Sequence, residues 1–172
     1  MGHDGADQGD PETRPQWHVE AVSLREMAPR GVLFLCVANS ARSQLAEGIA
    51  RSLAPAGVTV WSAGSQPTRV RPEAIAALAE IGIDISGHRS KPVSEIPAAQ
   101  VDVVITLCGE EECPVFLGKA RRLHWGLPDP AAVAGREEAR AAAFRRTRDE
   151  LRRRLGVVFG AGDASAAPLS RG

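Results

Sequence analysis

Short apolar runs alternate with apolar positions at helical spacing through the middle of the chain. Residues 32–35 are wholly apolar, which is typical of a strand covered on both faces, and Leu45, Ile49 and Leu53 follow at helical spacing. Further strand-like segments lie at 58–63, 101–107 and 121–125, and a helical pattern lies between Pro72 and Gly82. The alternation of strands with helices predicts a mainly parallel sheet.

The last long pattern, residues 136–158, is an amphipathic helix. Its apolar stripe consists of Phe144, Leu151, Leu155 and Val158. Five arginines fall mostly off this stripe and are expected to form a solvated face: Arg145, Arg146, Arg148, Arg152 and Arg153. The predicted fold class is therefore α/β, a three-layer α/β/α arrangement with helices on both faces of the sheet. Ligands are expected at the carboxyl edge of the strands.

Both ends of the chain differ in composition from its centre. Residues 1–30 carry six acidic and three basic side chains, and we expect a mobile N-terminal extension with at most a short helix over 19–27. Residues 160–172 are rich in Gly, Ala, Ser and Pro and are expected to form a mobile tail. The folded domain is placed at 31–159.

Charge and hydropathy exclude several classes of partner. The 172 residues include 21 basic and 21 acidic side chains, so no global field favours nucleic acid or a membrane surface. There is no apolar stretch of membrane-spanning length and the start is polar, which predicts a cytoplasmic protein. Three cysteines cannot all pair, and in a reducing compartment they are expected as thiols.

Two cysteines follow predicted strands at the same edge of the sheet. Cys36 follows residues 32–35, Cys108 follows residues 101–107, and five residues separate Cys36 from Arg42. A loop that enters a helix in this way directs backbone N–H groups at an anion. The expected oxyanion-binding residues are Val37, Ala38, Asn39, Ser40, Ala41, Arg42 and Ser43.

Each polar residue of the loop suits one task. The helix N-terminus would favour Cys36 as a thiolate nucleophile, and Ser43 can donate to its sulfur. Arg42 offers a planar fork for two oxygens of a tetrahedral anion. Asn39 tolerates a left-handed backbone and can tie the loop together. The alternative for Cys36 is a buried apolar thiol without chemistry.

In these motifs the chain resembles the arsenate reductases that share the low-molecular-weight protein tyrosine phosphatase fold. The matching segments are residues 36–48, 61–64, 82–88, 103–108, 113–114 and 124–131. The resemblance implies a four-stranded parallel sheet, with Cys36 as nucleophile, Arg42 as oxyanion binder and Asp129 as general acid. It also implies that Cys108 and Cys113 form a redox relay that a thioredoxin-type partner reduces.

Alternatives remain for several residues. From the sequence alone, Asp129 before Pro130 could equally turn the chain, and Cys108 and Cys113 could be ordinary thiols. A zinc site lacks enough ligands at suitable spacing, so no metal or cofactor is expected. His88 is expected to be a hydrogen-bonded structural histidine.

The chain departs from the family pattern in three places. Some members carry a further cysteine at the position of Ala41. Four residues separate Cys108 from Cys113, fewer than in thioredoxin-coupled members, which leaves the reductant open between thioredoxin, glutaredoxin and a small thiol. Members with a potassium site use oxygens that match Asn39, Glu47, Ser62 and a carboxylate at the position of Lys91. The lysine predicts that potassium has no effect.

The substrate expected from the resemblance is arsenate, with phosphate or sulfate as competing oxyanions. A tyrosine phosphatase would use Cys36, Arg42 and Asp129 in the same way, but it needs an aromatic cleft. The chain has no Tyr and only four Phe and three Trp. A non-catalytic arsenite-binding or redox-sensing protein would need the thiols but not Asp129. Both remain alternatives.

Overall fold

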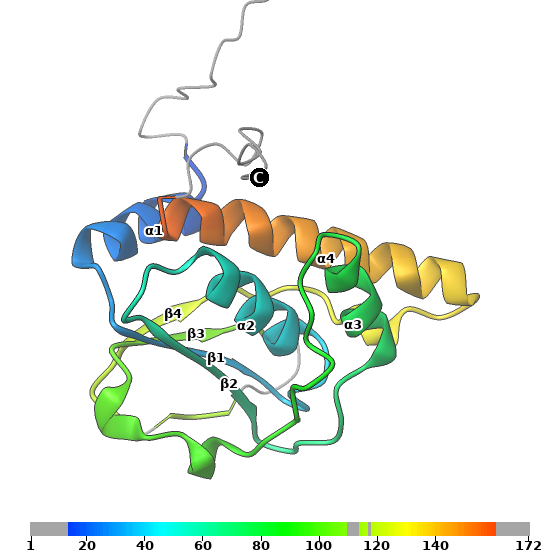
Figure 1. Ribbon diagram of the computed structural model, residues 1–172, viewed down its shortest axis with the longest axis horizontal. Helices are drawn as coiled ribbons and strands as arrows, with labels where there is room; N and C mark the ends of the chain where they lie inside the picture. The colour runs from blue at the N-terminus through cyan, green and yellow to red at the C-terminus, as the bar shows by residue number, and fades with distance from the viewer. Residues whose placement is uncertain (1–13, 110–113, 117, 161–172) are drawn as a thin grey trace, which may run out of the picture.

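Four parallel strands form a single sheet in the computed structural model, which describes residues 14–109, 114–116 and 118–160. The strands are β1 (Gly31–Cys36), β2 (Thr59–Gly64), β3 (Val103–Thr106) and β4 (Arg121–His124), in the order β2-β1-β3-β4 (Figure 1). The four-stranded parallel sheet is thus confirmed. Every residue of β1 is buried, as its unbroken apolar sequence predicts, because β1 lies in the interior of the sheet.

The strand register brings the expected site residues to one edge. Cys36 pairs with Gly64 across β1 and β2, and Thr106 pairs with His124 across β3 and β4. Backbone bonds continue the alignment beyond the strands, because Leu127 N donates to Leu107 O at 3.1 Å. The segments that follow β1, β3 and β4 therefore emerge side by side.

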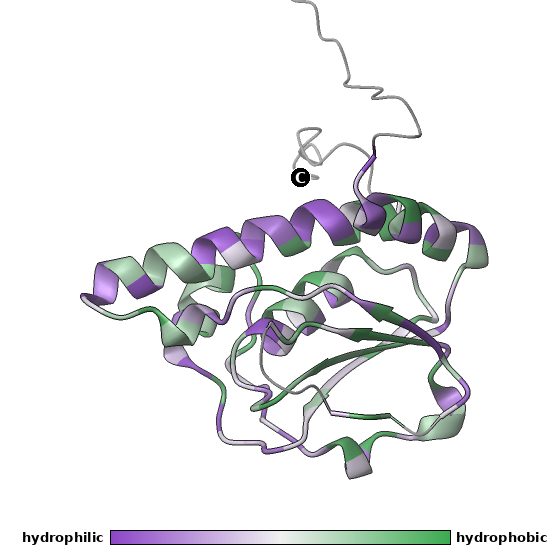
Figure 2. Cartoon of the chain, turned by 180° about the vertical axis from the view of Figure 1, so that it is seen from behind, coloured by the Kyte–Doolittle hydropathy of each residue, from purple (hydrophilic) through white to green (hydrophobic). Residues whose placement is uncertain are grey.

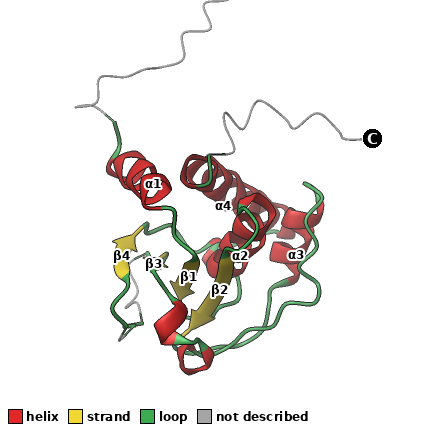
Figure 3. Ribbon diagram, turned by 60° about the vertical axis from the view of Figure 1, so that its left-hand side comes forward, coloured by secondary structure: helices red, strands yellow, loops and turns green. Residues whose placement is uncertain are grey.

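In the part of the chain that the structure describes, four α-helices cover one face of the sheet: α1 (Gln16–Met27), α2 (Arg42–Leu53), α3 (Pro72–Ala79) and α4 (Glu137–Val158). Their apolar side chains join Val32, Phe34, Val103 and Ile105 in one core. The opposite face packs Leu33, Leu35 and Val104 against Ile96 and Phe116, under the 3-10 helices η2 (Val93–Glu95) and η3 (Ala98–Gln100) (Figure 3). The second helical layer thus consists of short 3-10 turns and loops.

Two predictions, the start of the folded domain and the exposure of Arg148, need correction. Helix α1 packs along α4 and buries Ala21 and Leu24 in the core, so the folded unit begins by Gln16 and not at residue 31. Arg148 does not belong to a solvated face, because it is 9% exposed and donates to the carbonyl of Ala77 and to Glu80, both at 2.8 Å. It ties α4 to the end of α3.

The hydropathy of the elements matches their places in the fold. Figure 2 shows α4 as a mostly hydrophilic helix and the central strands as largely hydrophobic. The edge strand β4 is the exception, since only Leu123 of its four residues is buried. Within the described ranges, no helix combines the length and the apolar character that a membrane crossing requires. Residues 1–13 of the expected N-terminal extension and residues 161–172 of the expected tail lie outside the described residues.

Candidate active site

Cys36 ends β1 and stands at the opening of the loop that leads into α2. Its side chain is 2% exposed and is a free thiol, and Sγ lies 2.7 Å from Ser43 Oγ. Ser43 Oγ accepts a hydrogen bond from Asn39 Nδ2 at 2.8 Å. The single hydroxyl hydrogen of Ser43 is therefore available to the Cys36 sulfur, as the sequence predicted.

Asn39 holds the middle of the loop together. Its φ of 48° is left-handed, as predicted, and its side chain is fully buried. Nδ2 donates to Ser43 and to Ser62 Oγ at 2.9 Å, while Oδ1 accepts from Gln44 Nε2 and from the backbone N–H of Lys91, both at 3.0 Å. Four segments of the chain thus meet at one amide, which fixes the backbone geometry of the loop.

The loop between Cys36 and Arg42 is held from outside by residues 66–71. The backbone N–H groups of Gln66, Thr68 and Arg71 donate to the carbonyls of Val37, Ala38 and Ser40, at 2.9, 3.2 and 2.9 Å. Because these carbonyls are bound on the outer side, the peptide planes of the loop are fixed in orientation. A loop with fixed peptide planes suits an anion nest, in which successive backbone N–H groups bind one anion. No signal in the sequence pointed to these three bonds.

Gly64 allows the end of β2 to approach this loop. A Cβ at Gly64 would lie 2.4 Å from Val37 O and 2.9 Å from Asn39 N, so no larger residue fits without a shift of backbone. The geometry of the loop therefore depends on Gly64, for which the sequence predicted only the end of a strand.

Arg42 joins the loop to both neighbouring strand ends. The side chain is 5% exposed, and Nη1 donates to Leu127 O at 3.0 Å and to Leu107 O at 3.4 Å. These carbonyls lie directly before Cys108 and two residues before Asp129. The predicted anion-binding residue thus also positions the two segments that carry the other predicted groups.

Behind the loop, Glu47 is a buried carboxylate surrounded by donors. It is 2% exposed, accepts from Ser62 Oγ at 2.9 Å, and lies 3.4 Å from Lys91 Nζ and 3.0 Å from His88 Nδ1. Burial lowers the pKa of His88, and the charge of Glu47 opposes this shift. Lys91 thus puts an ammonium beside Glu47, and His88 is the hydrogen-bonded histidine that the sequence predicted.

Of the two predicted relay cysteines, Cys108 lies in the described part of the chain. Cys108 is fully buried two residues after the end of β3 and is disulfide-bonded, whereas Cys36 is not. Gly109, the next residue, is exposed. Cys113 lies outside the described residues.

Asp129 lies on the loop that follows β4. Its backbone is extended, with φ −73° and ψ 111°, and Oδ1 accepts from Ala131 N at 2.9 Å at the start of the 3-10 helix η4 (Pro130–Ala132). The side chain is half-buried and lines a cleft of about 710 Å³ together with Gly109 and His124. The carboxylate thus caps a turn and also lines a cleft beside the relay segment, and its role as an acid stays a prediction.

Comparison with known proteins gives one consistent result. The family described as low molecular weight phosphotyrosine protein phosphatase matches residues 31–164. The arsenate reductase of Bacillus subtilis is 41% identical over 126 residues, which cover 72% of this chain and 91% of that protein.

Solved structures agree with this match. A structure described as an arsenate reductase in the phosphate binding state is 36% identical with a TM-score of 0.64, over 77% of this chain and 98% of that one. A thioredoxin-dependent arsenate reductase of Corynebacterium glutamicum is 27% identical with a TM-score of 0.52, over 81% of this chain and 70% of that one.

Proposed function

Because the chain belongs to the low molecular weight phosphotyrosine protein phosphatase family, we propose that it reduces arsenate to arsenite, as relatives named arsenate reductase do. One observation carries the proposal beyond the family. Cys36 is a free thiol at the start of the loop, while Cys108, two residues beyond the adjacent strand, is disulfide-bonded. A phosphatase needs the first cysteine but has no use for the second.

In the first step, the Cys36 thiolate attacks the arsenic atom of arsenate. The hydroxyl of Ser43, 2.7 Å from the sulfur, stabilises the thiolate by donating to it. Backbone N–H groups of residues 37–43 and the guanidinium of Arg42 bind the anion's oxygens. This role for Arg42 agrees with its buried position between the loop and the carbonyls of Leu107 and Leu127.

The leaving oxygen of arsenate needs a proton, because hydroxide is a poor leaving group. Asp129 is the proposed acid. Its position two residues after Leu127, whose carbonyl binds Arg42, supports this role, and the bond to Ala131 N restrains the carboxylate. The products are an adduct with a bond between Cys36 Sγ and arsenic, and one water molecule.

The relay then supplies two electrons. Cys108, as a thiolate, attacks Cys36 Sγ, so that a sulfur–sulfur bond forms, the sulfur–arsenic bond breaks, and its electron pair stays on arsenic as arsenite leaves. Cys113 attacks Cys108 Sγ in turn, which releases Cys36 as thiolate and leaves a Cys108–Cys113 disulfide. The disulfide-bonded state of Cys108 is compatible with the end of this sequence.

A dithiol partner of the thioredoxin type would reduce that disulfide by exchange. The thioredoxin-dependent relative from Corynebacterium glutamicum supports this class of reductant. Such a cycle requires a reducing compartment, and we therefore propose a cytoplasmic location. Arsenic detoxification is the corresponding role, with phosphate and sulfate as competing anions.

The test is arsenate turnover with thioredoxin, thioredoxin reductase and NADPH, measured beside hydrolysis of para-nitrophenyl phosphate. The proposal predicts arsenate-dependent NADPH oxidation that greatly exceeds ester hydrolysis. Ester hydrolysis without arsenate reduction, with thioredoxin, glutaredoxin or a small thiol, would make the protein a phosphatase. Stoichiometric arsenite binding without either turnover would make it a binding or sensing protein.

A further inference from the structure

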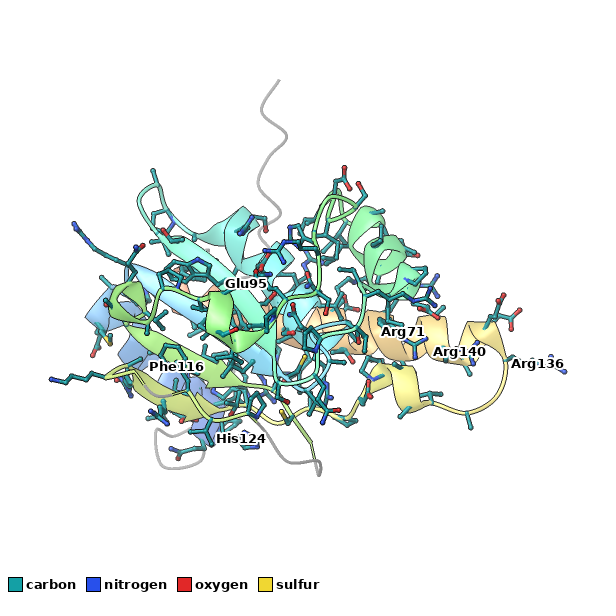
Figure 4. The ribbon with its side chains drawn as sticks, turned by 90° about the horizontal axis from the view of Figure 1, so that it is seen from below. Arg71, Glu95, Phe116, His124, Arg136 and Arg140 are labelled. Carbon is teal, nitrogen blue, oxygen red and sulfur yellow. The ribbon has the colours of Figure 1, made fainter. Side chains whose placement is uncertain are left out.

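The cleft beside Asp129 contains a histidine that the proposed reaction leaves without a role. His124 is the last residue of β4, and its side chain is exposed (Figure 4). It lines the same cleft as Asp129 and Gly109. Among the described residues that line this cleft, His124 and Asp129 are the ionisable ones.

Thr106 determines which ring nitrogen of His124 can accept a proton. The two residues are partners in the β3–β4 pairing, and Thr106 Oγ1 lies 2.7 Å from His124 Nδ1. The same hydroxyl donates to Leu123 O at 3.3 Å, and it can then accept from Nδ1–H. A neutral imidazole protonated on Nδ1 carries its lone pair on Nε2.

Nε2 of His124 lies near the backbone carbonyl of Cys108. A Cβ built on Gly126 would be 2.8 Å from both Cys108 O and His124 Nε2, so these two atoms are no further apart than twice that distance. A side chain at position 126 would collide with both atoms, so Gly126 allows the ring and this carbonyl to approach each other. The exposed imidazole therefore lies beside the backbone of the cysteine of the proposed relay.

We propose that His124 accepts the proton that the Cys108 thiol loses, directly or through one water in the cleft, when Cys108 becomes a nucleophile. The inference rests on the proposed function, since it deepens the relay step. As the Cys108 proton moves to Nε2, the resulting thiolate attacks Cys36 Sγ and arsenite leaves with the electron pair of the sulfur–arsenic bond. The imidazolium then releases its proton to solvent through the cleft.

The same group works in the reverse direction during reduction by the partner. When the partner's thiolate attacks the relay disulfide and Cys108 is the leaving sulfur, the imidazolium stabilises and then protonates it. Histidine suits both directions because its charge changes between pH 5 and 8. A histidine that only joined β4 to β3 through Thr106 would have no effect on the thiol.

The experiment measures the ionisation of Cys108 without arsenate. In the Cys36→Ser/Cys113→Ser background Cys108 is the only thiol, and thiolate absorbance at 240 nm is followed against pH under reducing conditions. His124→Asn keeps a donor for Thr106 but cannot take up a proton. Thr106→Val removes the hydroxyl that orients the ring, and Thr106→Ser is its matched control.

We expect His124→Asn to raise the titration midpoint of Cys108 by about one pH unit, so that the thiolate fraction at a given pH falls about tenfold. Thr106→Val should raise it less, and Thr106→Ser should leave it unchanged. Circular dichroism melts check folding, and His124→Gln replaces the Asn variant if that variant is unfolded. A midpoint within about 0.2 pH units of the background in both His124 variants would overturn the inference.

The experiments distinguish a failure of the proposed function from a failure of the proposed role of His124. If the parent protein reduces no arsenate while the His124 variants shift the titration, the proposed function is wrong but the histidine–thiol pair stands. If the parent reduces arsenate and the titration does not move, the role of His124 is wrong and the function stands. In the supporting case, His124→Asn also slows single-turnover arsenate reduction about tenfold or more, and this loss decreases as pH rises.

Discussion

The two sides of Cys36 differ in how their polar groups are paired. On the α2 side, a buried series of hydrogen bonds runs from Glu47 through Ser62, Asn39 and Ser43 to the Cys36 sulfur. On the β4 side, Asp129 and His124 face an open cleft. The first side has one well-defined geometry suited to an oxyanion. The second leaves its ionisable groups accessible to solvent, which suits proton transfer.

The largest effects are expected where the buried side meets the substrate. Cys36→Ser removes the nucleophile, and Arg42→Lys keeps the charge but loses the bidentate fork, so each should reduce arsenate turnover by about a thousandfold or more. Both variants should remain folded, as measured by circular dichroism. Substantial turnover by Cys36→Ser would contradict the mechanism.

On the open side, Asp129→Asn separates activity from stability. The amide oxygen can still accept from Ala131 N, so the free energy of unfolding should change by less than about 0.5 kcal/mol. Loss of the acid should slow arsenate reduction about a hundredfold or more in single-turnover measurements. If Asp129→Asn unfolds at much lower urea concentration and keeps its rate, Asp129 only turns the chain.

Gly64→Ala should damage the buried side through packing alone. The new Cβ would meet Val37 O at 2.4 Å, so we expect a loss of about 1–3 kcal/mol in unfolding free energy and weaker inhibition by phosphate. Gly156→Ala is the control, because its Cβ would meet nothing within 4 Å in helix α4, and it should be neutral or stabilising by up to about 1 kcal/mol. Equal urea melts for the two variants would refute the close approach at Gly64.

The smallest expected effect is that of potassium. Lys91 Nζ lies 3.4 Å from Glu47 Oε1, so an ammonium already stands beside the carboxylate that a cation would need. Thermal melts in potassium chloride and sodium chloride at equal ionic strength should therefore coincide. A potassium-specific rise in the midpoint would mean that Lys91 leaves room for the ion.

The sequence predicted the parts of the site that depend on local chemistry. The left-handed Asn39 and the Ser43 contact to Cys36 follow from residue types at fixed spacing in one loop, and both are present. The bonds from residues 66–71 could not be predicted, because they are made by backbone N–H groups of segments distant in sequence.

Long-range packing also explains the errors. Helix α1 contributes only Ala21 and Leu24 as fully buried apolar residues, which is too weak a pattern to separate it from a polar extension. Arg148 has the charge of a surface residue, and only the position of α3 makes it a buried hydrogen-bond donor. The roles of Cys108 and Cys113 came from family resemblance and stay predictions.

The relay is tested most directly by peptide mapping with mass spectrometry after the reduced parent protein has consumed one equivalent of arsenate. The account predicts a Cys108–Cys113 disulfide with Cys36 free, and at most one turnover when Cys113→Ser is supplied with thioredoxin. A dominant Cys36–Cys108 product in the parent, or repeated turnover by Cys113→Ser with thioredoxin alone, would contradict it.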